Sequence, residues 1–107
     1  MISTHILDTS KGSPAAGVNV SLEKQNNGSW FLMASEKTNS DGRIEFKNPA
    51  DAGTFRLTFG VEAYFQSQKL ESFFCDTPVI FKISDTQRKY HVPLLLNPFG
   101  FSTYRGS

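Results

Sequence analysis

The sequence contains a single cysteine, Cys75, among its 107 residues, so the chain cannot form an internal disulfide. Its 11 lysines and arginines nearly balance its 10 aspartates and glutamates, which leaves no basic excess of the kind that binds nucleic acid. No apolar run is long enough to span a bilayer, and the first residues lack the charged and apolar regions of a signal peptide. We therefore expect one cytoplasmic domain, residues 1–107, with neither a nucleic-acid nor a membrane partner.

Several catalytic motifs are also missing from the sequence. It has no Gly-x-Ser-x-Gly elbow and no glycine-rich phosphate loop. Its two histidines, His5 and His91, and its one cysteine show none of the short spacings typical of zinc ligands. We therefore expect no metal and no cofactor. Cys75 follows two phenylalanines, and this apolar context predicts a buried, inert thiol.

Aromatic residues are abundant, with 10 phenylalanines, three tyrosines and one tryptophan, and they suit pleated, half-buried surfaces. Apolar and polar residues alternate with a period of two in many places, which is typical of strands with one buried face. The alternation predicts eight short strands, at residues 4–8, 18–23, 30–34, 44–46, 54–59, 79–84, 89–95 and 101–105. Together they predict an all-β, two-sheet sandwich. The segment Val61–Lys69 lacks glycine and proline and predicts one short helix.

Turn signals separate the predicted strands. The segment Asn26–Ser29 predicts a hairpin, because its asparagines and glycine accept positive φ angles. Trp30, Leu32 and Ala34 alternate after this turn, and we expect all three to lie on the buried face.

The predicted strand at residues 89–95 is apolar on both faces. Tyr90, Val92 and Leu94 share one face, while Pro93 and Leu95 share the other with His91. The outer face of an isolated sandwich is expected to be polar, so this strand predicts a contact with a second subunit.

Both histidines fall within predicted strands, out of phase with the apolar residues. His5 alternates with Ile6, and His91 with Tyr90 and Val92, so both imidazoles should point away from the main apolar face. One interpretation of each is a structural hydrogen-bonding residue. The other is proton transfer, for which imidazole is the best-matched side chain near neutral pH.

Two arginines can each be interpreted in two ways. Arg43 follows a turn directly, and Arg105 lies close to the end of the chain. Each could be an ordinary surface residue, or a planar charged fork that orients a carbonyl or carboxylate group. The ending Tyr104–Ser107 closes an aromatic, apolar run that is unlike a frayed tail, and this favours a site or an interface for its polar groups.

Several motifs along the whole chain resemble those of a known family and occur in the same order. Thr4–Thr9, Gly12 and Pro14–Val18 resemble the opening signature of the transthyretin-like proteins. The later motifs that continue the resemblance are Asp41–Arg43, Ala63–Phe65 and Tyr90–Leu96. The ending Tyr104–Ser107 resembles the enzymatic branch of this family, the 5-hydroxyisourate hydrolases, and not its thyroid-hormone carriers.

The resemblance implies a transthyretin-like sandwich that assembles as a homotetramer, a dimer of dimers, with active sites in the channel between dimers. It implies hydrolysis of 5-hydroxyisourate to 2-oxo-4-hydroxy-4-carboxy-5-ureidoimidazoline in urate degradation. The catalytic residues that it implies are His5, Arg43, His91 and Ser107, and Tyr104 and Arg105 would bind the substrate. The alternatives are a carrier of a thyroid-hormone-type small molecule and an interaction domain without small-molecule chemistry.

These residues suggest a mechanism by which water opens a ring amide. One histidine, with His5 favoured, would activate the water, and His91 would assist proton transfer or bind the ring. Arg43 would hold a carbonyl and stabilise the oxyanion, and Ser107 would orient the water or the substrate. The sequence leaves open which histidine is the base.

Overall fold

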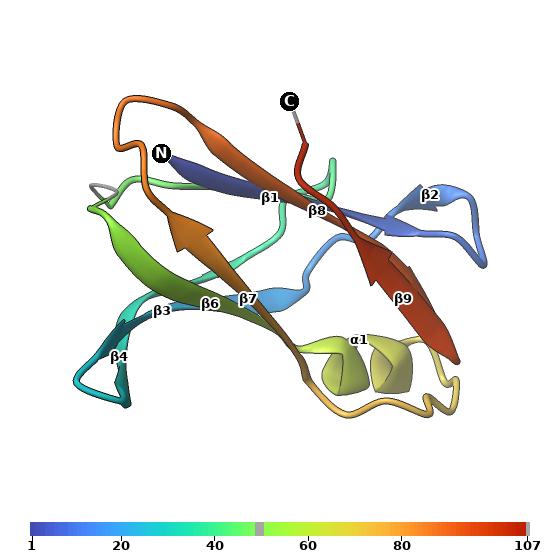
Figure 1. The fold of residues 1–107 in the computed structure, drawn as a ribbon. Helices are drawn as coiled ribbons and strands as arrows, with labels where there is room; N and C mark the ends of the chain where they lie inside the picture. The colour runs from blue at the N-terminus through green and yellow to red at the C-terminus, as the bar shows by residue number, and fades with distance from the viewer. Residues whose placement is uncertain (49–50, 107) are drawn as a thin grey trace.

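The computed structural model describes residues 1–48 and 51–106, which form two packed β-sheets and one helix (Figure 1). The first sheet contains β2 (Ser13–Pro14), β1 (Ile2–Asp8), β8 (Tyr90–Asn97) and β9 (Gly100–Thr103) in that order, and β5 (Arg43–Phe46) also pairs with β1. The second sheet has the order β4 (Ser29–Lys37), β3 (Asn19–Asn26), β6 (Gly53–Phe59) and β7 (Thr77–Ile83). β1 and β8 run parallel, and every other pair is antiparallel. The predicted two-sheet sandwich is confirmed.

The core lies between the facing surfaces of the two sheets. Side chains alternate along β1, so that Ile2 and Ile6 are buried while Ser3 and His5 are half-buried on the outer face. The largest side chains with almost no exposed surface are Phe46, Phe55, Phe59 and Phe65. Packing these rings contributes roughly 1.5–3 kcal/mol for each fully buried side chain relative to an exposed one. The outer face of the first sheet, which carries Ser3 and His5, is therefore supported by an apolar inner face.

The helix α1 (Val61–Ser67) connects β6 to β7 and covers one end of the sandwich (Figure 1). It buries Val61, Tyr64 and Phe65 against the sheets. The Tyr64 hydroxyl donates a 2.7 Å hydrogen bond to the carboxylate of Asp8, which is fully buried at the end of β1. This contact ties the helix to the sheet that carries both histidines. Within the described residues, no helix has the length and apolar character needed to cross a membrane.

The boundaries of several elements differ from the predictions. The two-residue strand β2 was not predicted, because two residues are too few to show alternation. The helix ends at Ser67 and not at Lys69, whose φ of 58° is left-handed and incompatible with the helix. The last strand ends at Thr103, so Tyr104 and Arg105 lie beyond it.

The predicted burial of Leu32 is wrong. A bulge lies between Leu22 and Glu23, where the pairing register shifts so that Ala34 faces Leu22 and Leu32 faces Glu23. An inserted residue reverses the faces of the residues beyond it. Leu32 is consequently 66% exposed, while Met33 and Ala34 pack against the core.

The predicted burial of Cys75 is also wrong, because its thiol is exposed. Cys75 lies in the loop between α1 and β7. The neighbouring Phe73 is itself 74% exposed, so the apolar context of the cysteine does not reflect burial.

Candidate active site

The outer face of the first sheet brings Arg43 and His5 together. The pairing of β5 with β1 places Arg43 directly opposite His5. The parallel pairing of β1 with β8 places His5 beside Pro93. These three residues form one row across three strands, in which neighbouring strands are about 4.8 Å apart. The guanidinium and the first imidazole therefore start from adjacent positions on one face.

A second row lies next to the first and contains His91. Glu45 pairs with Ser3, Ser3 pairs with His91, and His91 forms an isolated antiparallel bridge with Gly106. Residues two apart on a strand share a face and lie roughly 7 Å apart, so the two rows are neighbours. His5, Arg43 and His91 thus occupy one small area of the sheet.

A hollow of about 380 Å³ opens beside Arg43 and His91, and His5 is not among the residues that line it. Its polar lining combines cationic, anionic and neutral groups, so it can offer both hydrogen-bond donors and acceptors to a small ring. The residues that line it are Ser3, Thr4, Arg43, Ile44, Glu45, Lys89 and His91.

The turn before β5 fixes the backbone of Arg43, the first residue of that strand. The side-chain oxygen of Asn39 accepts hydrogen bonds from the backbone N–H groups of Asp41 and Arg43, at 2.9 and 3.0 Å. Gly42 has a φ of 73°, and its carbonyl accepts a 2.8 Å hydrogen bond from the backbone of Ile6. A Cβ atom at position 42 would lie 2.6 Å from the carbonyl oxygen of Ile6, so this turn requires glycine for both conformation and space.

His91 is half-buried and held by its neighbours on both sides. Its Nδ1 atom lies 2.8 Å from the hydroxyl oxygen of Ser3. Burial lowers the pKa of His91, the positive charges of Arg43 and His5 lower it further, and a hydrogen bond between the ring and the backbone of Ser3 opposes them in part. The pKa of His91 therefore lies below its ordinary value, and the ring is neutral at pH 7.

The segment after β9 returns to His91. The backbone N–H of Gly106 donates a 2.8 Å hydrogen bond to the carbonyl of His91. Tyr104 precedes this bridge and is 58% exposed. The end of the described chain therefore lies beside the second histidine.

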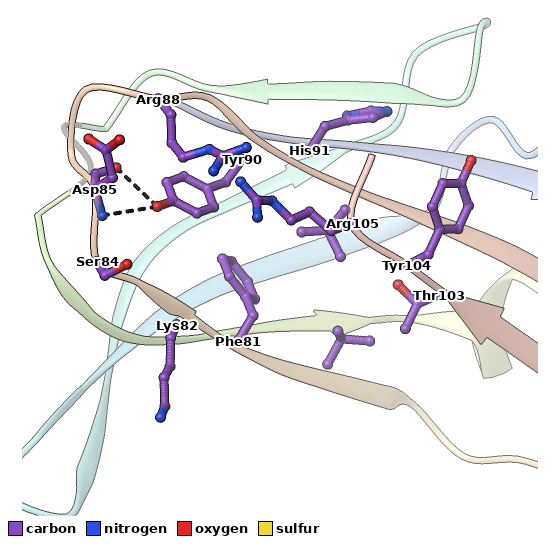
Figure 2. Close-up of a pocket in the computed structure, with 12 residues that line it drawn as sticks. Phe81, Lys82, Ser84, Asp85, Arg88, Tyr90, His91, Thr103, Tyr104 and Arg105 are labelled. Atoms are coloured by element: carbon purple, nitrogen blue, oxygen red, sulfur yellow. Dashed lines mark hydrogen bonds between the residues drawn. The ribbon is translucent and has the colours of Figure 1, made fainter. Parts of the chain in front are cut away.

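Arg105 points to the other side of the same segment. Its guanidinium carbon lies 5.7 Å from the centre of the Tyr90 ring, and that of Arg88 lies 5.8 Å from the same ring. Figure 2 shows both guanidiniums in a second hollow, of about 320 Å³, with the His91 ring directed away from Arg105. The hydroxyl of Tyr90 is held there by two hydrogen bonds with the backbone of Asp85.

The comparison with known proteins identifies the family of the chain. The family model of the HIUase/Transthyretin family, where HIUase stands for 5-hydroxyisourate hydrolase, matches residues 2–106. The chain belongs to this family. The resemblance inferred from the sequence motifs is thereby confirmed.

Members of the HIUase/transthyretin family with both kinds of function resemble the chain. The 5-hydroxyisourate hydrolase of Salmonella dublin is 46% identical over 110 residues, which cover 100% of this chain and 81% of the relative. The solved 5-hydroxyisourate hydrolase of Klebsiella pneumoniae has a TM-score of 0.87 and 42% identity, covering 99% of this chain and 98% of that one. Sea bream transthyretin in complex with thyroxine has a TM-score of 0.92 and 29% identity, covering 98% and 93%. The shared fold alone thus does not distinguish enzyme from carrier, and the distinction depends on site residues.

The structure places most of the residues that the sequence predicts for the site. His5, Arg43 and His91 lie on one face of the sheet. Tyr104 lies two residues before Gly106, which bridges to His91, and Arg105 lies over the Tyr90 ring. The predicted catalytic residue Ser107 lies outside the described residues. Across residues 1–48 and 51–106, no three histidine, cysteine, aspartate or glutamate side chains are grouped closely enough to hold a metal ion.

Sequence reasoning gave no role to two residues that contact His91, namely Ser3 and Gly106. Ser3 has the same strand phase as His5, so alternation could have placed it on the site face. Gly106 is part of the terminal motif, but its contact with His91 depends on how the chain returns after β9.

Proposed function

We propose that the chain hydrolyses 5-hydroxyisourate by attack of water on a ring amide. One observation carries the proposal: His5, Arg43 and His91 occupy two adjacent rows on one open face of the sheet. The high identity to a 5-hydroxyisourate hydrolase supports the choice of substrate.

The proposed reaction has simple chemical requirements. The water oxygen attacks the carbonyl carbon, the carbon–nitrogen bond breaks, the ring nitrogen takes a proton, and the new acid ionises to a carboxylate. The step needs a base for water, a donor to the oxyanion and a proton for the leaving nitrogen. No covalent intermediate and no cofactor are required.

The side chains on the outer face match these requirements. His5 is proposed as the base, because its pairing with Arg43 places an imidazole beside a permanently charged donor. Arg43 would hold the substrate carbonyl and stabilise the oxyanion. His91, neutral at pH 7, would bind the ring or assist proton transfer.

The terminal segment is proposed to complete the site. Tyr104 is exposed near the bridge to His91 and would contact the substrate. Arg105 is proposed to act from the side of the segment that faces Tyr90. Its guanidinium lies over the Tyr90 ring there and would anchor the terminal segment. The proposed role of Ser107, to orient water or substrate, rests on the sequence motif alone.

We also propose that the protein assembles as a homotetramer, a dimer of dimers, over this face. Beyond the two polar rows, Leu7 pairs with Leu95, and both are only half-buried on the outer face. Together with Pro93 they make one side of the site apolar, as the sequence predicted for the strand at residues 89–95. Sedimentation at micromolar concentration tests this, since a monomer mass would contradict it.

A cytoplasmic setting is proposed on the chemistry of its cysteine. Cys75 is a free, exposed thiol, which suits a reducing compartment better than an oxidising one. Cell fractionation that finds the protein in an oxidising compartment would contradict this.

One assay tests the enzymatic proposal directly. 5-Hydroxyisourate is generated with urate oxidase, and its ultraviolet decay is followed with and without the protein. We expect decay faster than the spontaneous rate with the wild type, and the spontaneous rate with a His5→Ala/His91→Ala double variant. Equal decay for the wild type and the double variant would contradict the proposal.

The competing function is a small-molecule carrier. It is favoured by the likeness of the backbone to sea bream transthyretin in complex with thyroxine. Thyroxine binding without accelerated 5-hydroxyisourate decay would support the carrier. Accelerated decay that thyroxine does not inhibit would support the enzyme.

A further inference from the structure

The hydroxyl of Ser3 has one hydrogen-bond partner among the described residues, the Nδ1 atom of His91 at 2.8 Å. The two residues pair directly in the parallel register of β1 and β8. A hydroxyl has one proton to donate and two lone pairs. If Ser3 accepted a proton from Nδ1, its own proton would have no partner in the described protein, whereas donation to Nδ1 satisfies it.

We propose that Ser3 donates its hydroxyl proton to Nδ1 of His91 and thereby holds this ring in the tautomer that carries hydrogen on Nε2. The state of one ring nitrogen is set by the hydrogen bond that the other makes. In this tautomer Nε2 is a donor and has no lone pair free to accept a proton. The inference rests on the proposed hydrolysis, and it removes the choice between the two histidines: His5 is the base.

Gly106 holds the opposite edge of the same ring. A Cβ atom at position 106 would lie 2.5 Å from Cδ2 of His91 and 3.2 Å from its Cγ. Gly106 is not among the glycines with positive φ, so space and not backbone conformation requires glycine here. The ring is therefore confined between Ser3 on β1 and Gly106 on the terminal segment.

The charges around the ring agree with a neutral donor. His5 and Arg43 lie in the adjacent row, and Glu45 and Lys89 line the same hollow. The pKa of His91 is lowered by burial first and then by the charges of Arg43 and His5. A neutral ring carries its one hydrogen on either Nδ1 or Nε2, so a neighbour can select the tautomer. An imidazolium carries hydrogen on both nitrogens and offers no such choice.

The tautomer assigns separate tasks to the two histidines. His91 donates a hydrogen bond from Nε2 to the carbonyl oxygen as this becomes an oxyanion, and no proton leaves His91. His5 takes the proton from the attacking water and passes it to the leaving ring nitrogen when the carbon–nitrogen bond breaks. Ser3 also lines the hollow, and its task here is to hold the His91 ring, so it is a positioning residue.

Nitrogen NMR of the histidine side chains tests the assignment. With only two histidines in the chain, His5→Ala identifies the His91 signals. At neutral pH we expect the Nε2–H tautomer in the wild type and a mixture of tautomers in Ser3→Ala. A wild-type ring with hydrogen on Nδ1 would overturn the proposal, as would an unchanged tautomer in Ser3→Ala.

Kinetics give a second readout. We expect kcat of Ser3→Ala to fall roughly 10- to 100-fold, less than loss of the whole acid–base group, with KM little changed. Ser3→Thr keeps the hydroxyl and should retain most of kcat. Ser35→Ala, at an exposed serine on β4 of the other sheet, is the matched control and should leave kcat unchanged. Full kcat in Ser3→Ala would overturn the positioning role.

Gly106→Ala tests the other side of the ring. The added methyl group should displace His91, shift its NMR signals and lower kcat, while unchanged signals would contradict the confinement. The NMR result does not depend on turnover. If the wild type hydrolyses no 5-hydroxyisourate while its tautomer depends on Ser3, the proposed function fails and the tautomer assignment stands.

Discussion

Arg43 and His5 are direct cross-strand partners, so the position of the guanidinium relative to the first imidazole is set by the register of β5 on β1. A slip of β5 by one residue would turn Arg43 towards the core and away from His5. The Asn39–Gly42 turn prevents such a slip, because it bonds to β1 and β5 at once. The site geometry therefore depends on a turn with no catalytic group of its own.

Removing either imidazole should lower activity without unfolding the protein. A positioned acid–base group contributes on the order of 100- to 10,000-fold, so His5→Ala and His91→Ala should each lower kcat for 5-hydroxyisourate by about that factor. Both rings are half-buried on the outer face, so the thermal unfolding midpoint should change little. Near-full activity in both variants would show that the site lies elsewhere.

Replacing Arg43 should change both the rate and the titration of His91. Loss of one oxyanion donor costs about 100- to 1,000-fold in kcat in comparable sites, which is our expectation for Arg43→Gln. Arg43→Lys keeps the charge but loses the planar fork, and should lie between the wild type and Arg43→Gln. The positive charge of Arg43 lowers the pKa of His91, so Arg43→Gln should raise this pKa while Arg43→Lys should not. A pH titration by NMR measures the pKa of His91, and an unchanged value in Arg43→Gln would contradict the effect of the Arg43 charge on this ring.

The turn before β5 can be tested with two matched glycines. Gly42→Ala should destabilise the protein by more than about 1 kcal/mol, because position 42 has a positive φ and its Cβ would meet the backbone of Ile6. Gly12→Ala is the control, since Gly12 has a similar φ of 69° but nothing within 4 Å of its Cβ position. Urea unfolding measures both variants. Equal destabilisation would mean that the close approach to Ile6 has no energetic effect.

The buried carboxylate of Asp8 should make stability depend on pH. Burial raises the pKa of Asp8, but hydrogen bonds from Ser10, Tyr64 and Lys11 outweigh it and hold the pKa below its ordinary value. A lowered pKa in the folded state means that the unfolded chain binds more protons. The stabilisation is therefore present above the ordinary pKa of 3.8 and is lost as pH falls through the folded value.

Tyr64→Phe isolates this effect. It removes the donor to Asp8 and should cost roughly 1.5–3 kcal/mol at pH 7, as expected for a hydrogen bond to a charged group. The difference from the wild type should be smaller at pH 3 than at pH 7, because pH 3 lies below the ordinary pKa of 3.8, where the stabilisation from the carboxylate is being lost. Urea unfolding at both pH values checks this, and a pH-independent difference would contradict the role of the carboxylate.

Deletion of residues 104–107 should abolish activity. It removes the bridge between Gly106 and His91 and the nearby Tyr104. The core should remain intact, because Tyr104 and Arg105 are exposed. Circular dichroism verifies the fold while the 5-hydroxyisourate assay measures activity, and full activity would refute the role of the terminal segment.

The directions of the two histidines could be predicted from the sequence, because alternation within one strand is a local pattern. His5 and His91 point away from the apolar face as predicted. Their convergence could not be derived from alternation, since it depends on the parallel register of two strands at opposite ends of the chain. The family resemblance supplied it instead.

The two wrong predictions, the burial of Leu32 and the burial of Cys75, have a common physical cause: burial depends on tertiary structure and not on the local sequence alone. Leu32 is exposed because of a bulge, which depends on how β4 pairs with β3 and not on the residues of β4 alone. Cys75 is exposed because its apolar neighbours belong to a surface loop. Ser3 and Gly106 were missed because their contacts with the ring of His91 depend on tertiary structure and not on local sequence.

The pairing of Ser3 with His91 joins residues that are 88 positions apart in the chain. Closing so long a loop is entropically costly, and proteins dominated by such distant contacts fold slowly. The reaction face can therefore form only after nearly the whole polypeptide has been made and its first and last strands have met. During refolding, catalytic activity should return together with the slowest structural phase, and no shorter fragment should have any.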